Sequence, residues 1–307
     1  MKKLISLILI LILCLSLAAA CGKKTDTPDP DPSPDGSQQQ DPDGSQQQDP
    51  DGGKQGEQSG EDSGGESSGT PDGGGTASDP EAQPLSWTDR IFTGTFTDES
   101  VTKDPLVMLT VYLPKVSGND DIELYYQGRL DSIKQQAQTT YLDLGRGNYQ
   151  FASQGIGIFS PVTVEIGYHV LRNDGRLFSV RREVYENTGG AHPSITLQSE
   201  TFRVSDGAMM VFSDLFTVSY DDAVAKIRPM IEDQMDKRIK EYGSEYYFDD
   251  AKSQLFAMWD KSDWYLTDDS LVMYWQTYAI SPYVAGVQEF SIPLSELADI
   301  IDAIWIS

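Results

Sequence analysis

The chain has 307 residues, of which 48 are acidic and 23 are basic, so its formal net charge at pH 7 is −25. A nucleic-acid-binding protein needs a basic face, and a chain of this charge does not suggest one. Two Cys and two His are too few for a disulfide scaffold or a Cys/His zinc cluster. We therefore expect no nucleic-acid partner, no metal site and no cofactor.

The N-terminus has the order of a secretory signal. A basic start precedes the apolar run of residues 4–17 and the small residues Ala18-Ala19-Ala20. Cys21 follows directly, and this pattern resembles the bacterial lipoprotein signal, whose Cys is lipidated. We predict a signal peptide over residues 1–20, lipidation of Cys21 and anchoring to the outer face of the bacterial cell membrane. The alternatives are a plain secretion signal with an incidental Cys and a retained transmembrane helix, for which the run is short.

Residues 21–85 form a low-complexity segment that is rich in Gly, Ser, Asp, Pro and Gln. An eight-residue repeat, Pro34–Asp41, recurs as Pro42–Asp49. Such a composition buries too little apolar surface to offset the entropy lost on ordering. It predicts a disordered acidic spacer. Calcium binding by its Asp-Pro and Asp-Gly steps is the alternative, but the ligand spacing of a known calcium loop is missing.

Aromatic and β-branched residues return from residue 86 onward, which predicts a globular region that extends to residue 307. This region holds 33 acidic and 18 basic residues, a net charge of −15. Its length suits one large domain or two small ones. We divide it into an N-terminal part, residues 86–210, and a C-terminal part, residues 211–307.

Alternating or continuous apolar runs between turn residues predict strands. They cover residues 106–113, 162–171, 177–185, 194–204, 209–212, 270–275 and 288–292. Apolar residues at helical spacing predict helices over 130–142, 219–242 and 294–305. Ser219 is placed to cap the second helix, and Pro229 within it predicts a kink. Because strands and helices do not alternate strictly, we predict an α+β fold, a mainly antiparallel sheet packed with a few helices.

The sequence shows no catalytic motif. Only His169 and His192 could serve as a catalytic base of the Ser–His–Asp kind, and no Gly-x-Ser-x-Gly elbow is present. No His-x-x-x-His pair places two imidazoles on one helical face. With 33 acids in the globular region, a glycosidase pair of carboxylates cannot be singled out. We therefore expect no catalytic residue and no enzyme activity.

The most unusual local run is residues 186–193, Glu-Asn-Thr-Gly-Gly-Ala-His-Pro. Two glycines allow positive φ, and Pro193 restrains His192 to an extended conformation. The run is either a ligand-binding loop that presents His192 or a tight connection whose His caps buried backbone groups. Aromatic residues next to acids elsewhere suit sugar stacking, and they suit a core and its rim at least as well.

Ordered motifs over about 100 residues resemble a known family. They are Tyr185 to His192, Thr201-Phe202, Asp206-Gly207, Phe212 to Phe216, Trp264 to Val272, Tyr278 to Gly286 and Phe290 to Pro293. The pattern resembles the extracytoplasmic domain of RsiV-type anti-sigma factors, and it is similar to the domain that precedes the catalytic part of PdaC-type peptidoglycan deacetylases. The resemblance covers about residues 87–305 and implies an α+β ectodomain at the cell envelope that, in the RsiV branch, binds lysozyme.

An anti-sigma factor also needs a cytoplasmic segment and a spanning helix, and a PdaC-type enzyme needs a metal-binding catalytic domain. We expect this chain to carry neither, which leaves a binding module on a lipid tether. The favoured function is capture of lysozyme or a similar cationic secreted protein, as sensor or decoy. The alternatives are binding of wall glycan and an unrecognised enzyme. We nominate His192 and Tyr283 as candidate ligand-binding residues.

Overall fold

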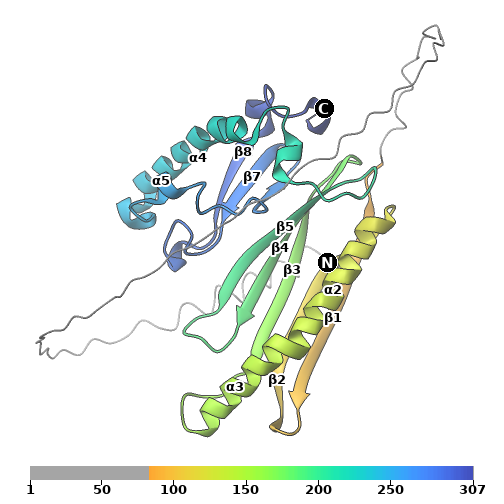
Figure 1. Ribbon diagram of the computed structural model, residues 1–307, viewed down its shortest axis with the longest axis vertical. Helices are drawn as coiled ribbons and strands as arrows, with labels where there is room; N and C mark the ends of the chain where they lie inside the picture. The colour runs from red at the N-terminus through yellow and green to blue at the C-terminus, as the bar shows by residue number, and fades with distance from the viewer. Residues whose placement is uncertain (1–82, 307) are drawn as a thin grey trace, which may run out of the picture. The chain divides into compact units, whose positions relative to one another are not determined.

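The computed structural model describes residues 83–306 (Figure 1). The predicted signal peptide, Cys21 and the predicted spacer up to residue 82 lie outside this range. The described residues form a five-stranded and a three-stranded sheet with helices packed against them. All strand pairs are antiparallel except β2 with β3, so the predicted α+β fold with mainly antiparallel pairing is confirmed.

The first sheet has the strand order β1-β2-β3-β4-β5. Its strands are β1 (Ser86–Asp98), β2 (Thr102–Ser117), β3 (Val162–Asn173), β4 (Leu177–Asn187) and β5 (Ser194–Arg203). The predicted strands at 106–113, 162–171, 177–185 and 194–204 are therefore confirmed, and a turn at residues 173–175 joins β3 to β4. No strand was predicted over β1. It lies at the sheet edge with no buried side chain, so it lacks the apolar alternation that reveals a strand.

A long helical segment connects β2 to β3 and covers one face of this sheet (Figure 1). It consists of α2 (Asp120–Gln136), a π-helical turn (Ala137–Tyr141) and α3 (Leu142–Ser153). Such a crossover is what a parallel strand pair requires. Along β2, Leu109, Val111 and Leu113 are buried on the helix side, whereas Met108 and Tyr112, which point to the opposite face, are exposed. This alternation places the first core between the sheet and the helices.

The prediction of a helix over 130–142 was wrong in its bounds, because the helical segment begins ten residues earlier and ends 11 later. Asn119 begins it: its Oδ1 accepts hydrogen bonds from the backbone N–H groups of Asp121 and Ile122, each at 3.0 Å. Gly128, Gly145 and Gly147 weaken the helical signal in the sequence. Packing requires at least one of them, since a Cβ on Gly145 would lie 2.6 Å from the Leu106 carbonyl oxygen.

The second sheet has the order β6-β7-β8. Its strands are β6 (Trp264–Leu266), β7 (Ser270–Trp275) and β8 (Gln288–Pro293). Strands β7 and β8 confirm the predicted strands at 270–275 and 288–292. Helix α4 (Tyr220–Tyr242) packs against β8, and the short α5 (Ala251–Gln254) follows it. Ser219 caps α4 by accepting from Asp222 N–H at 3.2 Å, as predicted, and Pro229 lies inside the helix.

The second core lies between α4 and the three-stranded sheet. Ala223, Ile227, Ile231 and Met235 form the buried stripe of α4. Trp259, Trp264 and Trp275 are also buried there, so these rings belong to the core and not to a sugar-binding surface. A smaller cluster of Leu197, Tyr265, Val272 and Tyr274 packs the two sheets against each other.

Two predicted elements were wrong. The strand over 209–212 is absent: Met209 forms only an isolated bridge with Phe202, and residues 212–215 make a 3-10 turn. The Asp214 carboxylate starts that turn by accepting from the backbone N–H of Val211 at 3.0 Å. The helix over 294–305 is replaced by two 3-10 turns, Leu294–Leu297 and Ala303–Trp305, because Ile301 between them pairs with Phe216.

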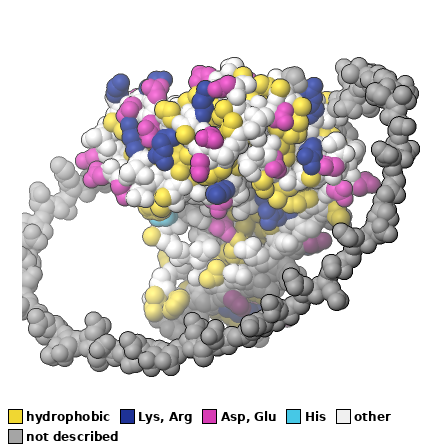
Figure 2. Space-filling view, turned by 45° about the horizontal axis from the view of Figure 1, so that its top comes forward, with side chains coloured by type: hydrophobic (Ala, Val, Ile, Leu, Met, Phe, Trp, Pro, Cys, Tyr) yellow, Lys and Arg dark blue, Asp and Glu magenta, His cyan; other side chains and the backbone are white. Residues whose placement is uncertain are grey.

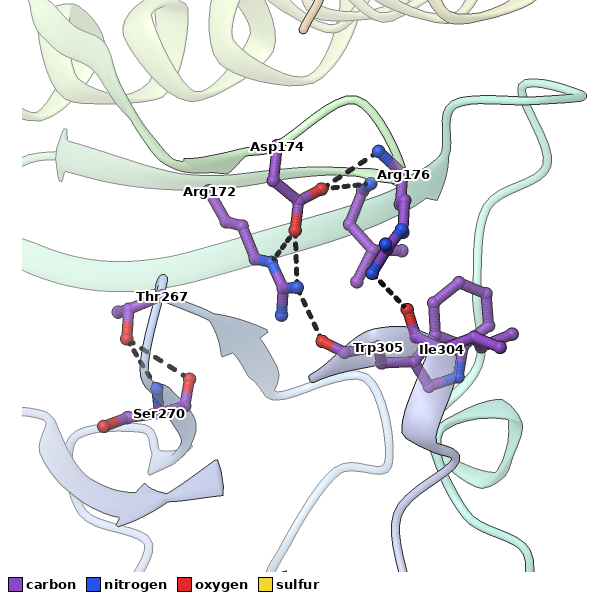
Figure 3. A network of polar contacts seen from close by, with 8 residues as sticks. Arg172, Asp174, Arg176, Thr267, Ser270, Ile304 and Trp305 are labelled. Carbon is purple, nitrogen blue, oxygen red and sulfur yellow. Dashed lines mark hydrogen bonds and ion pairs between the residues drawn. The ribbon is translucent and has the colours of Figure 1, made fainter. Parts of the chain in front are cut away.

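Side chains of the β3–β4 turn fix this C-terminal segment (Figure 3). The buried Arg172 donates to the Trp305 carbonyl at 2.6 Å and to the Asp174 carboxylate, and Arg176 donates to the Ile304 carbonyl at 3.1 Å. These contacts join the end of the chain to the first sheet. No helix within residues 83–306 is long and apolar enough to cross a membrane.

Candidate functional site

The structure brings together the two residues nominated from the sequence and adds a third. His192 and Tyr283 stack with their ring centroids 4.0 Å apart. Tyr278 lies beside both, with its centroid 5.7 Å from that of Tyr283 and 6.3 Å from that of His192. We call His192, Tyr278 and Tyr283 the aromatic rim. His169, by contrast, is an exposed residue of β3, on the polar face that the sequence pattern indicates.

The loop that carries His192 is held against α3. The Asn148 side-chain amide donates to the Thr188 carbonyl at 2.9 Å. Gly189 has φ +90°, and a Cβ there would lie 2.6 Å from the Asn148 amide nitrogen, so the close approach requires glycine. Of the two interpretations of this loop, the structure shows an exposed His192 on a firmly packed connection. Its Nδ1 is 3.0 Å from the carbonyl oxygen of the half-buried Pro193.

The two tyrosines come from the segment between β7 and β8. The Tyr283 hydroxyl donates to the same Pro193 carbonyl at 2.6 Å, which ties this segment to the His192 loop. Tyr278 has φ 68°, the one positive φ outside glycine in the described range. Such a backbone is strained for a tyrosine, and strain of this kind clusters at functional sites. It directs a ring that is 55% exposed toward His192, whose Nε2 lies 3.3 Å from the Tyr278 hydroxyl.

The surroundings of the aromatic rim are acidic. The Phe248 N–H donates to the Ile280 carbonyl at 3.1 Å, which places residues 241–250 next to the tyrosine segment. The three neighbouring segments, 187–193, 241–250 and 276–287, contain four carboxylates and no Lys or Arg; the acids are Glu241, Glu245, Asp249 and Asp250. A hydrogen bond to Glu241 raises the pKa of the exposed Tyr242, so this ring stays neutral beside the acids.

Other parts of the described surface are more balanced in charge. Figure 2 shows basic and acidic side chains interspersed over the face that it draws. Many of them pair: Lys226 with Asp299, Lys237 with Asp233 and Lys252 with Asp236 lie within 3.0 Å of each other. Arg238 is half-buried, donates to Tyr247 and Gln288 and lies over the Phe290 ring. Within residues 83–306, by contrast, none of the four acids of residues 241–250 forms an ion pair.

A concave region of about 890 Å³ runs along the outer edge of β5. We call it the β5-edge groove. Its lining includes Arg129 on α2, Ser199 on β5, and Lys261, Asp263 and Gln276 from the C-terminal part. Asp263 is 8% exposed and accepts from the Gln276 amide at 3.1 Å. Burial raises the pKa of Asp263 to about 6, and the nearby Asp260 charge adds to this effect.

Neither site assembles a catalytic constellation. The groove lining contains no His, and the aromatic rim contains no carboxylate bonded to His192. Among residues 83–306, no group of three or more His, Cys, Asp and Glu side chains is placed to hold a metal ion. The aromatic rim consists of flat, partly exposed rings, of which His192 and Tyr283 are stacked.

Comparison with known proteins finds a family match in the C-terminal part. Residues 213–295 match the family model described as a protein of unknown function (DUF3298). No curated protein matches the chain. A crystal structure of a DUF3298 family member from Bacteroides fragilis is similar at 17% identity with a TM-score of 0.54, and the match covers 73% of this chain and 96% of that one.

A DUF3298 family protein from Pseudomonas aeruginosa matches at 14% identity with a TM-score of 0.49, over 74% of this chain and 97% of that one. Because the Bacteroides fragilis protein is 17% identical in sequence, its structure shows that the fold is shared and nothing further. The matched family segment contains α4, the second sheet and both tyrosines of the aromatic rim.

Sequence reasoning missed Tyr278 and Asp263. Tyr278 stands in the run Tyr-Ala-Ile-Ser-Pro-Tyr, so its spacing from Tyr283 could have suggested a second exposed ring. No comparable signal marks Asp263, because its burial depends on Tyr274 of β7 and on Gln276, which directly follows β7. One acid among 33 in the globular region cannot be singled out by its local sequence.

Proposed function

We propose that this protein is a membrane-tethered, extracytoplasmic binding protein that captures lysozyme or a similar cationic secreted protein, as a sensor or a decoy. The observation that carries the proposal is the aromatic rim, in which three rings from two distant segments lie together and His192 stacks on Tyr283. The neighbouring segments 187–193, 241–250 and 276–287 hold four carboxylates and no Lys or Arg. The motifs that resemble the extracytoplasmic domain of RsiV-type anti-sigma factors support the same function. The Cys21 pattern supports a lipid tether.

The rings of the aromatic rim and the charge around them suit a protein–protein interface. Tyrosines are enriched among the few residues that carry most of the binding free energy, since they bury a large area at low entropic cost. Here the packing of Tyr283 on His192 fixes its orientation before a partner arrives. Four nearby carboxylates and a net charge of −15 over the globular region would draw a cationic protein into encounter.

Substitution in the aromatic rim tests this function. We expect Tyr283→Ala in the full-length protein to weaken calorimetric binding of a c-type lysozyme by about 10- to 100-fold, the loss typical of a central interface tyrosine. Phe151→Ala is the matched control, because Phe151 is an aromatic residue of α3 that is 57% exposed. The control should bind like the parent protein. Equal affinities of the parent and of Tyr283→Ala would remove the aromatic rim from the interface.

Wall-glycan binding is the second candidate, and the flat rings of His192 and Tyr283 favour it, since sugar rings stack on such faces. Purified peptidoglycan fragments separate the two functions. Binding of fragments that Tyr283→Ala abolishes, in the absence of lysozyme binding, would assign the aromatic rim to glycan. Binding of lysozyme alone would exclude it.

A further inference from the structure

We propose that the β5-edge groove binds a short extended peptide with a free carboxylate, which adds as a strand to the outer edge of β5. This site is separate from the aromatic rim and goes beyond the capture of a secreted protein. The proposal rests on unpaired backbone groups of an edge strand inside a cavity and on two cations that line the same cavity.

The direction of the backbone groups follows from the sheet. In an antiparallel strand, the N–H and C=O of one residue point to the same side, and the side alternates along the chain. The Leu197 N–H and C=O point away from β4, because both bond to the Gln276 side-chain amide, at 3.1 and 2.8 Å. The Thr201 carbonyl points the same way, since it accepts from the Met210 N–H at 2.8 Å.

Ser199 lies between these residues with the same parity. Its N–H and C=O, together with the Thr201 N–H, therefore point outward into the groove. Within residues 83–306, no hydrogen-bond partner reaches these three groups. The edge of β5 is thus paired at both ends, by Gln276 and by Met210, and open in the middle.

A peptide backbone supplies what this opening lacks. One residue of an added strand accepts from the Ser199 N–H and donates to its C=O, as in other cases of strand addition. The Gln276 side-chain amide already makes the same pair of hydrogen bonds with Leu197, two residues earlier on β5. A volume of about 890 Å³ lies in the range of ligand pockets and has room for a few residues. The exposed apolar side chains of Met209 and Val211 along the groove can contact the ligand's side chains.

The charges select a carboxylate. Among residues 83–306, Arg129 lines the groove without an ion pair: it donates to the Tyr125 hydroxyl at 3.3 Å, and its buried Nε has no hydrogen-bond partner there. In the same described range, Lys261 has no carboxylate partner and lies 4.3 Å from the centre of the Tyr220 ring. The third cation, Arg182, is neutralised by the buried Glu200 at 2.8 Å. On the wall that carries Lys261, the Asp260 and Asp263 oxygens can accept from ligand N–H groups.

The test uses the full-length protein and acetyl-Ala-Val-Ala-Leu with a free carboxyl terminus. Hydrogen exchange measured by mass spectrometry should slow in residues 194–203 when this probe is added, because Ser199 and Thr201 N–H groups become bonded. The same peptide with an amidated C-terminus should bind about tenfold more weakly. A probe N-methylated at Val and the second Ala should give no protection, because it lacks the donors that strand pairing needs.

Substitutions of the two cations test where the carboxylate of the peptide binds. Arg129→Gln and Lys261→Gln should each reduce affinity for the free acid toward that for the amide, whereas Lys115→Gln, an exposed cation on β2, should not. Unchanged melting temperatures would show that the variants fold.

The proposal is overturned if 10 mM free acid leaves exchange in 194–203 unchanged, or if the N-methylated probe protects equally. Protection by chitotetraose alone would also overturn it, in favour of a glycan site. Tyr283→Ala should leave peptide binding intact, so failure here and failure of lysozyme capture are distinguishable.

Discussion

The carboxyl group of Asp263 has a raised pKa that its local sequence does not indicate. Its carboxyl is buried beside Gln276 with no cationic partner among the described residues, and burial raises its pKa to about 6. The unfolded chain gives an Asp a pKa of about 3.9. The folded protein therefore holds this proton more tightly than the unfolded chain does. The resulting stabilisation is fully present below about pH 4 and is lost as the pH rises through about 6.

Asn is neutral at every pH and mimics the protonated acid. We expect Asp263→Asn to raise the free energy of unfolding at pH 7.5 by roughly 1–3 kcal/mol and to change it little at pH 4. Urea denaturation at the two pH values measures this. Asp260→Asn is the control of opposite sign, because hydrogen bonds from Ser262 lower the pKa of Asp260. Replacing the carboxylate by a neutral amide weakens these charge-assisted bonds and should destabilise the protein at pH 7.5. A destabilised Asp263→Asn at pH 7.5 would contradict the assignment.

Residues of the candidate binding site were partly predictable. The Gly-Gly and Pro193 beside His192, and the Pro-Tyr step at Tyr283, are local signals of fixed loops, and the structure stacks these two rings. Tyr278 depends on a strained backbone that no composition rule marks. The three unpaired groups of Ser199 and Thr201 depend on what lies opposite them, which only the assembled sheet reveals.

At the scale of elements, α3 provides a matched pair of glycines. A Cβ on Gly145 would meet the Leu106 carbonyl oxygen at 2.6 Å, whereas a Cβ on Gly147 would meet nothing within 4 Å. We expect Gly145→Ala to lower the free energy of unfolding by about 1–3 kcal/mol, as overpacking against backbone does. Gly147→Ala should raise it by about 0.5–1 kcal/mol, the helix preference of Ala over Gly. Chemical denaturation of both variants tests the packing of α3 on β2, and equal effects would contradict it.

The elements also show where sequence patterns suffice. Helix α4 was predictable because a cap, acidic first-turn residues and a regular apolar stripe agree. The segment from α2 to α3 was recognised only in its middle, since its glycines lower helix propensity and tertiary packing overrides them. Strand β1 and the two C-terminal turns are set by their neighbours: β2 for the strand, and Phe216, Arg172 and Arg176 for the end of the chain.

For the whole molecule, the α+β fold followed from the order of strands and helices, but the pairing of distant segments did not. The aromatic rim joins the loop after β4 to the segment after β7, and these lie about 90 residues apart in the chain. The parallel contact of β2 with β3 is likewise a tertiary outcome of the helical crossover. The two sheets pack through Leu197, Tyr265 and Tyr274, and the hydrogen bond from Tyr283 to Pro193 joins the two segments that form the aromatic rim.

We propose that the aromatic rim captures a cationic protein through specific contacts and not by charge alone. Titration calorimetry of the full-length protein with a c-type lysozyme, at low and at near-physiological salt, tests it most directly. Charge attraction between exposed groups is screened over about 8 Å at physiological ionic strength, whereas buried aromatic contacts persist. We expect saturable one-to-one binding that survives the higher salt with a moderate loss of affinity. Heat that disappears at near-physiological salt would contradict the claim.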